Sequence, residues 1–174
     1  PLEVKKAFQF LRSDDPRTKR DGENYIPTDQ LYVLSPDGQP INFKKARRFT
    51  RSEMMVMEML STNEWKRPMY FATTIGSDYH LGLDPYLELT GMAYRITPTR
   101  SADGRPRVNT EVMYDNMMNK FRYGNVNKPG IYLDENTLRM CRTHRMMFSE
   151  LAEALYEEGK HDKAIAVLDY AEEM

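Results

Sequence analysis

Apolar residues in the first third of the chain change from helical spacing to short runs and back again. Residues 4–11 repeat apolar side chains at helical intervals, so they predict a short helix that ends before a polar loop over 14–24. Two apolar runs then flank Ser-Pro-Asp-Gly at 35–38, which predicts a β-hairpin, because proline suits a turn corner and glycine tolerates positive φ. Residues 50–62 predict a second helix, with Thr50 or Ser52 as its N-cap.

The stretch NEWKRPMYFATTIGSDYHLGLDPYLELTGMAYRITP, residues 63–98, predicts a strand, a helix and a second strand. Pro68 has no backbone N–H to donate, so it belongs at the start of the strand MYFATTI. Asp84 and Pro85 are a favourable helix opening, and we expect a short helix over 86–91, followed by the strand MAYRIT. Together with the hairpin, this βαβ-like unit predicts an α+β domain with a small mixed sheet.

Composition changes after Pro98, where the polar segment TRSADGRPRVN carries glycine and proline. We therefore expect an α+β domain at 1–104 and an all-α segment at 105–174. Within the second part, residues 110–124 predict one helix, and Asp134 is expected to cap a longer one. One apolar stripe marks the long helix, made of Leu138, Cys141, Phe148, Leu151 and Leu155.

The segment RMMFSELAEALYEEGKHDKAIAVLDYAEEM resembles one tetratricopeptide repeat, a helix–turn–helix unit of 34 residues. Its packing positions are expected at Phe148, Leu151, Ala152, Leu155, Gly159, Ala164, Leu168 and Ala171. The alanines let the two backbones approach, the large residues fill the groove between the helices, and Gly159 makes the turn. A generic helical hairpin is the alternative interpretation. A lone repeat cannot bury its own faces, so further repeats are expected in the parent chain.

Charge and cysteine content exclude several classes of protein. A net charge of −1 and a pI near 6.4 argue against a dedicated nucleic-acid-binding protein. The single cysteine, Cys141, excludes an internal disulfide framework. No apolar run approaches the roughly 18 residues that predict a membrane-spanning helix. The chain begins at Pro1, which we interpret as a processed form or an excised piece.

Candidate chemistry is sparse. Trp65 and Arg67 are candidates for a carbohydrate or peptide contact, because tryptophan stacks on sugars and arginine donates in a fixed fork. The alternative is a core-edge tryptophan beside a structural salt bridge. Asp78 and His80 follow a predicted strand and are candidates for sharing a proton, although a solvated loop is the simpler interpretation. Scattered histidines predict no metal site, and the absence of phosphate-loop, cysteine-pair and nucleophile motifs predicts no cofactor and no catalytic residue.

A cationic run, NFKKARRFTR, places five basic residues between and just beyond two phenylalanines. These residues are Lys44, Lys45, Arg47, Arg48 and Arg51. Such a run can contact anionic lipid headgroups or nucleic acid. The alternative is a solvated face whose charge is neutralised by acidic residues elsewhere in the chain.

NEWKRPMYFATTIGSD followed by YLELTGMAYRITP, with PTDQLYVLSPDG and KKAFQFLRSDD, resembles the soluble C-terminal region of a bacterial multi-pass membrane protein family. That family is similar to the protein O-mannosyltransferase class of glycosyltransferases. The resemblance implies that the membrane half, outside this chain, holds the catalytic machinery and that this part lies on the periplasmic side of the inner membrane. It carries no catalytic residue over to this sequence.

We therefore expect a non-catalytic extracytoplasmic accessory domain that binds or positions an acceptor or partner protein. Two alternatives stay open. One is a small ligand-binding or sugar-binding domain, or a small enzyme, with a pocket near Arg67 and Asp78. The other is a freestanding tetratricopeptide-type adaptor, in which the helical hairpin alone binds a partner.

Overall fold

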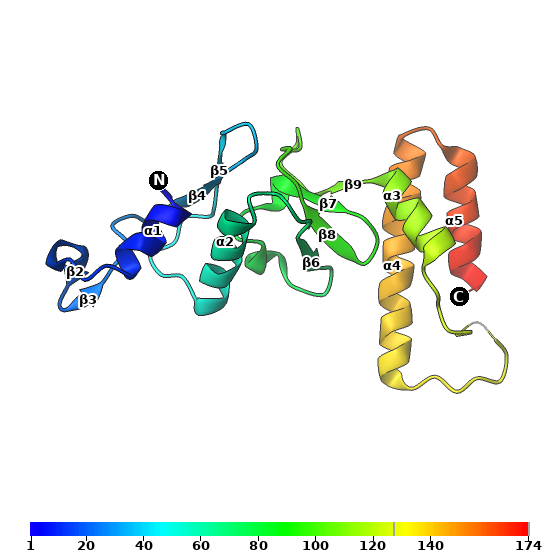
Figure 1. Ribbon diagram of the computed structural model, residues 1–174. Coiled ribbons are helices and arrows are strands. Elements are labelled where there is room, and N and C mark those ends of the chain that lie inside the picture. The colour runs from blue at the N-terminus through cyan, green and yellow to red at the C-terminus, as the bar shows by residue number, and fades with distance from the viewer. Residues whose placement is uncertain (127, 174) are drawn as a thin grey trace. The chain divides into compact units, whose positions relative to one another are not determined.

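The computed structural model describes residues 1–126 and 128–173, and the chain forms two compact units (Figure 1). The first unit comprises Pro1–Leu87 and Arg95–Arg105, and the second comprises Glu88–Tyr94 and Pro106–Met174. The predicted α+β class with a C-terminal helical hairpin is confirmed. The chain passes between the units after Leu87, after Tyr94 and after Arg105, so the segment Glu88–Tyr94 belongs to the second unit. The division into domains at 1–104 and 105–174 stays a prediction.

The first unit begins with a three-stranded sheet of order β1-β4-β5 and the helix α1. Its elements are β1 (Leu2–Glu3), α1 (Val4–Leu11), β4 (Leu31–Leu34) and β5 (Pro40–Asn42). Strands β4 and β5 pair antiparallel with Val33 opposite Ile41, which confirms the predicted hairpin. β1 lies parallel to β4 with Leu2 opposite Leu31, so the chain's first residues close the other edge.

The loop predicted over 14–24 is wrong in part, because it contains a second, two-stranded hairpin. Strand β2 (Lys19–Arg20) pairs antiparallel with β3 (Glu23–Asn24). The two residues between them, Asp21 and Gly22, both have positive φ, of 55° and 85°. This is the backbone that a tight two-residue hairpin turn requires, and Asp-Gly is one of the dipeptides that adopt it most readily.

Helix α2 (Arg51–Asn63) begins at the predicted Thr50 N-cap. The Thr50 hydroxyl accepts from the Glu53 backbone N–H, while the Glu53 carboxylate accepts from the Thr50 backbone N–H, which completes a capping box. One face of α2 buries Met57 and Leu60. This face lies against α1 and β4, so the helix covers the small sheet of the first unit.

The helix predicted over 86–91 is wrong. Asp84–Tyr86 forms only a short 3-10 turn, and the chain continues as a strand. The third sheet has the order β6-β8-β7-β9, formed by β6 (Tyr70–Ala72), β7 (Leu87–Leu89), β8 (Ala93–Ile96) and β9 (Arg107–Val108). All three residues of β7 are buried, so the run that resembles a short helix is a fully covered strand. Gly91 turns the chain with φ of 137°, a conformation that side chains with a Cβ rarely adopt.

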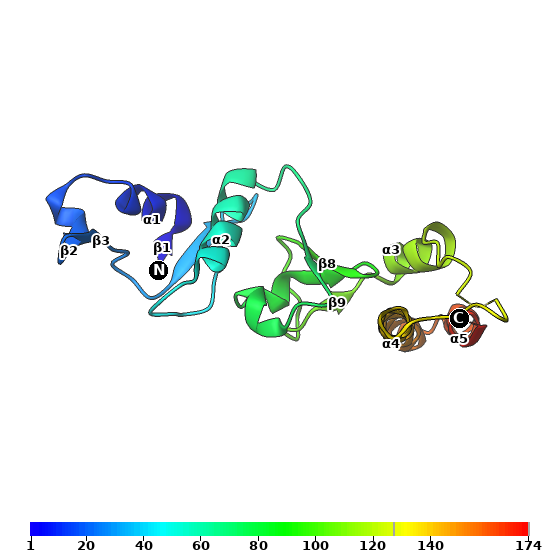
Figure 2. The same ribbon diagram turned by 90° about the horizontal axis from the view of Figure 1, so that it is seen from below.

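After β9 along the chain, the second unit consists of helices and their connecting loops. Its helices are α3 (Thr110–Tyr114), a π-helical turn (Asp115–Lys120), α4 (Glu135–Glu157) and α5 (His161–Glu173). The Asp134 carboxylate accepts from the Thr137 backbone N–H at 2.7 Å, which confirms the predicted cap of α4. The helix predicted over 110–124 ends at Lys120, where the π-helical turn gives way to extended backbone at Phe121. Figure 2 shows α4 and α5 end-on beside one another.

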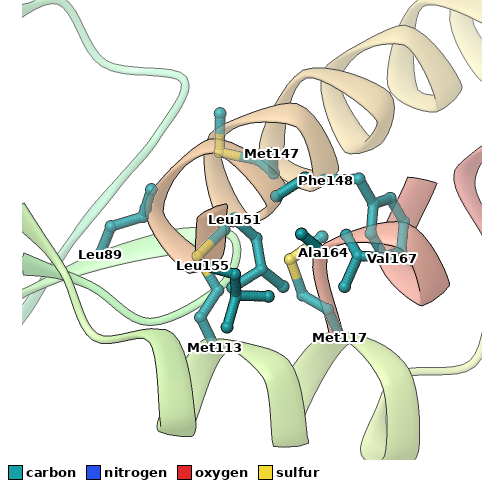
Figure 3. Packing of buried hydrophobic residues seen from close by; sticks show 10 residues of the cluster. Leu89, Met113, Met117, Met147, Phe148, Leu151, Leu155, Ala164 and Val167 are labelled. Carbon is teal, nitrogen blue, oxygen red and sulfur yellow. The ribbon is translucent and has the colours of Figure 1, made fainter. Parts of the chain in front are cut away.

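The core of the second unit lies between the hairpin and the α3 segment (Figure 3). From the hairpin it takes Phe148, Leu151, Leu155 and Val167, none of which is exposed to solvent. Met113 and Met117 pack against them from α3 and the π-helical turn, and both are fully buried. Unbranched, flexible methionines fill such an irregular gap well.

The structure places most of the predicted repeat positions at the interface of α4 and α5. Phe148, Leu151, Ala152, Leu155 and Ala164 are buried, Ala171 packs against the cluster, and Gly159 occupies the turn with φ of 75°. Leu168 differs, because it is 51% exposed. The inner position belongs to Val167, one residue earlier and therefore about 100° around the helix. Leu138 is also exposed, so the buried stripe of α4 begins only at Met147.

We expect Phe148→Ala to lower the free energy of unfolding by about 3–5 kcal/mol, because it removes a fully buried ring and leaves a cavity. Met146→Ala is the matched control, since Met146 lies two residues earlier on α4 and is 63% exposed. Urea denaturation of both variants measures the difference. Equal losses for the two variants would show that the ring is not part of the stabilising core.

Candidate functional site

The structure separates the two residues of the first candidate pair, Trp65 and Arg67. The half-buried Trp65 has a left-handed backbone with φ of 61°, and its indole Nε1 donates to the Leu34 carbonyl at 2.7 Å. Arg67 is held through its backbone by the Asn63 side-chain amide, and its exposed side chain lines a different depression beside Met59. Trp65 and Arg67 therefore do not face one ligand site together.

The second candidate pair, Asp78 and His80, is also not a pair. His80 is 4% exposed, and its Nδ1 lies 2.8 Å from Asp84 Oδ1. Its ring stacks on Phe71 with the ring centroids 5.4 Å apart. Asp78 is exposed, and its backbone carbonyl accepts from Lys44 Nζ at 3.0 Å. Sequence reasoning missed Asp84 as the partner, because that residue was assigned to a helix opening.

No candidate cation site emerges from these residues. Within 1–126 and 128–173, no group of three or more histidine, cysteine, aspartate or glutamate side chains is placed to hold a metal ion. Arg67 and Asp78 share neither a cavity nor a hydrogen bond in this part of the chain. The geometry therefore brings neither Trp65 with Arg67 nor Asp78 with His80 into one site, and the pair that it does form is His80 with Asp84.

A cavity of about 310 Å³ does lie beside Trp65, on the side away from Arg67. It is lined by Glu3, Lys5, Val33, Leu34, Ser35, Pro36, Leu60, Ser61, Glu64 and Trp65. Lys5 Nζ lies 2.6 Å from Glu64 Oε1, and Lys66 Nζ lies 2.9 Å from Glu64 Oε2. An aromatic wall and a fixed ion pair thus border the same space. Lys5 is far from Glu64 in sequence, so no local pattern predicts this cavity.

Hydrogen bonds from Lys5 and then from Lys66 lower the pKa of Glu64 from 4.5 to about 2. The same contact with Glu64 raises the pKa of Lys5. Ionised Glu64 therefore holds α1 to the end of α2 over the whole neutral range. The carboxylate is fully exposed, so solvent screening keeps this contribution small.

An apolar depression lies between α4 and α5, and the core alanines Ala152 and Ala164 reach it. It measures about 420 Å³ and is lined by Ser149, Ala152, Glu153, Tyr156, His161, Ala164, Ile165 and Leu168, which we call the hairpin groove. Buried Ala152 and Ala164 form its floor. Tyr156, Ile165 and Leu168 form its walls and are 66%, 58% and 51% exposed. The groove is thus an apolar surface open to solvent.

Acidic side chains are numerous on this part of the hairpin. In the segment 149–173 they are Glu150, Glu153, Glu157, Glu158, Asp162, Asp169, Glu172 and Glu173. Glu153 lines the hairpin groove, whereas Glu158 contacts Lys160 at 2.8 Å and accepts from the Thr110 hydroxyl. The two basic residues of that segment, Lys160 and Lys163, both contact Glu111 of α3, with Nζ–carboxylate distances of 2.6 and 3.5 Å. The Glu153 carboxylate therefore gives the lining of the groove an acidic group.

A third cavity, of about 270 Å³, contains Cys141 and His144. His144 Nδ1 lies 2.7 Å from the Met140 carbonyl, and its ring meets Tyr123 edge-on. The Tyr123 hydroxyl donates to the Met117 carbonyl at 2.9 Å, and burial raises its pKa to about 12. These polar atoms serve the packing of the loop before α4. The half-buried thiol of Cys141 lies in an apolar wall.

We expect the pH dependence of stability to change in Glu64→Gln. Because the pKa of Glu64 is lowered in the folded state, its contribution is present above about pH 4.5 and is lost as the pH falls towards 2. The difference in urea midpoint between wild type and Glu64→Gln should therefore shrink over that window. Glu23→Gln is the control, since Glu23 is exposed and forms no ion pair within the described residues. A constant difference from pH 6 to pH 2 would contradict the assignment.

No helix in the described part of the chain is both long and apolar enough to cross a lipid bilayer. Comparison with curated proteins and with solved structures gives no significant match. Comparison with family models does give one, to TMEM260-associated domain 2, over residues 1–115. The match covers the whole first unit, with the Trp65 cavity, and the part of the second unit that runs through the end of α3. The chain therefore belongs to the TMEM260-associated domain 2 family, a domain associated with a family of membrane proteins.

Proposed function

We propose that this chain is the non-catalytic accessory part of a membrane protein and that its hairpin groove binds a helical segment of an acceptor or partner protein. The observation that carries the proposal is the open apolar groove itself. In the groove, α4 and α5 present an apolar surface that is open to solvent. The membership of a domain family that is associated with membrane proteins supports an accessory role.

The groove has the shape and chemistry that an amphipathic helix recognises. Its floor consists of Ala152 and Ala164, whose small side chains let a third backbone approach the hairpin closely. Its walls offer Tyr156, Ile165 and Leu168 to an apolar stripe on the incoming helix. Exposed apolar side chains gathered in this way on one face are typical of protein interaction sites.

The charge around the groove specifies the partner further. Acidic side chains dominate α5 and the end of α4, while Lys160 and Lys163 are held by Glu111. A helix with basic residues flanking its apolar stripe is complementary to this surface, and an acidic helix is repelled. We therefore expect the bound segment to be basic and amphipathic.

The finer assignment draws on the resemblances in sequence. The helical hairpin fits a tetratricopeptide-like unit, and such units bind partner segments through helical grooves. The WKRPMYFA run supports a glycosyltransferase-like parent, in which the acceptor is the protein to be modified. The extracytoplasmic side rests on that same resemblance. In this proposal the accessory part holds the acceptor near a membrane-embedded active site that lies outside the chain.

The test is photo-crosslinking in the full-length membrane protein. A photoreactive residue at Leu168 should crosslink to an acceptor or partner protein, at a segment with an apolar stripe and basic flanks that mass spectrometry identifies. The same residue at Tyr132, which is 89% exposed and outside the groove, is the control. Crosslinks mainly to a second copy of the chain, or equal at both positions, would overturn the proposal.

We expect Ile165→Ser with Leu168→Ser to reduce copurification of that partner by at least about tenfold, because two apolar walls of the groove are lost. Both side chains are more than half exposed, so the unfolding midpoint should change little. The matched control is Met140→Ser with Met146→Ser, two exposed apolar residues of α4 outside the groove. Equal losses in the two double variants would show that the groove is not the site.

The cavity beside Trp65 supports a second candidate function, the binding of a small carbohydrate. The Trp65 indole ring is fixed by the hydrogen bond that its Nε1 donates to the Leu34 carbonyl. The Lys5–Glu64 pair supplies charged hydrogen-bonding groups at the rim of the cavity. An aromatic face beside fixed polar groups is a common arrangement for sugars. This site differs from the pocket near Arg67 and Asp78 that the sequence left open as an alternative, because neither of those residues lines the cavity.

Intrinsic fluorescence tests this candidate directly, because Trp65 is the only tryptophan of the chain. Titration with a panel of monosaccharides and short oligosaccharides should shift or quench its emission in a saturable way. Lys5→Met should weaken the response by removing the rim donor, while Lys6→Met should not, since Lys6 does not line the cavity. An emission that no sugar changes at millimolar concentration would reject a carbohydrate site.

A further inference from the structure

The loop that joins β5 to α2, residues 43–50, is fixed to the first unit at both ends. Phe43 is fully buried, and the Lys44 backbone N–H donates to the Leu81 carbonyl at 2.7 Å. The Ala46 backbone N–H donates to the Asp29 carbonyl at 2.8 Å. The capping box of α2 then fixes the chain at Thr50. A loop held in this way presents its side chains in defined positions.

Four cations project from this loop and from the first residue of α2. We call Lys45, Arg47, Arg48 and Arg51 the basic cluster; all four side chains are exposed. None of them forms an ion pair within the residues that the structure describes. The fifth basic residue of the run, Lys44, differs, because its Nζ contacts the Glu53 carboxylate at 2.8 Å and the Asp78 carbonyl at 3.0 Å.

Acidic residues of the fold do not neutralise the basic cluster. Glu53, the nearest acid along α2, is taken up by Lys44 and by the Thr50 backbone, and these contacts lower its pKa. Asp29 offers its backbone carbonyl to the loop, but its carboxylate forms no ion pair in the described residues. The cluster also lies at the positive end of the α2 dipole, where cations are unfavourable for the helix. The positive charge of the basic cluster therefore has no explanation in the stability of the fold.

We propose that the basic cluster binds the anionic headgroups of a lipid bilayer. The chain belongs to a domain family that is associated with membrane proteins, and this context favours a bilayer as the anionic surface. A flat, mobile anionic surface needs only exposed point charges, each of which strengthens attachment to it. This inference uses the family membership and is independent of the hairpin groove.

Nucleic acid fits the same residues less well. Single-stranded nucleic acid requires exposed aromatic rings on which bases stack. The two phenylalanines of the run do not supply them, because Phe43 is buried and Phe49 is partly buried.

The test is cosedimentation of the full chain with vesicles of phosphatidylcholine alone and of phosphatidylcholine with phosphatidylglycerol. We expect binding only to the anionic vesicles, weakening as salt is raised. Neutralising one basic residue should lower the partition coefficient about fivefold at low salt. The quadruple variant with Lys45→Gln, Arg47→Gln, Arg48→Gln and Arg51→Gln should lose more than about a hundredfold.

Two matched variants make the result specific. The variant with Lys128→Gln, Arg139→Gln, Arg142→Gln and Arg145→Gln removes the same charge from exposed positions of the second unit and should keep most of the binding. Replacing Arg47, Arg48 and Arg51 by lysine should also keep it, because point charges suffice. Equal losses in both glutamine variants, equal binding to neutral vesicles, or tighter binding to a single-stranded oligonucleotide than to anionic vesicles would each overturn the proposal.

Discussion

A two-helix hairpin has two broad faces, and burying both requires apolar cover on each. In this protein α3 and the π-helical turn cover one face with Met113 and Met117, which pack on Leu151 and Leu155. On the other face Ile165 and Leu168 are exposed, and no described residue of the second unit covers them. The proposed partner helix would bury this second face, as a neighbouring repeat does in stacked helical hairpins.

In the first unit, the arrangement of charged side chains around α2 is the distinguishing feature. Ion pairs tie α1 to α2, with Lys5 against Glu64 and Arg12 against Glu58. The same tie places Trp65 over a small cavity with a charged rim. Ion pairs thus occupy Glu64 and Glu58 near the C-terminal end of α2 and Glu53 near its N-terminal end, where the basic cluster is left without an ion pair in the described residues. The two ligands proposed for the first unit, a carbohydrate and an anionic bilayer, are assigned to these two ends.

Some elements followed directly from sequence, and others did not. The Thr50 and Asp134 caps, the hairpin around Gly38 and the helices α4 and α5 depend on local chemistry, so periodicity and turn residues predict them. Strand β7 was mistaken for a helix, because its three residues are buried on both faces and show no alternation. The sequence predicts Leu168 on the buried side of α5, where the structure has Val167, because the spacing within a single repeat does not distinguish these two neighbours.

Sequence by itself determined the α+β class, the capped helical hairpin and the cationic run, because each rests on contacts between near neighbours in the chain. Tertiary structure alone decided which residues meet. It joined His80 to Asp84 rather than to Asp78, and it set Trp65 beside Lys5 rather than Arg67. Long-range pairing depends on how whole elements pack, and the spacing of residues along one chain carries no signal for it.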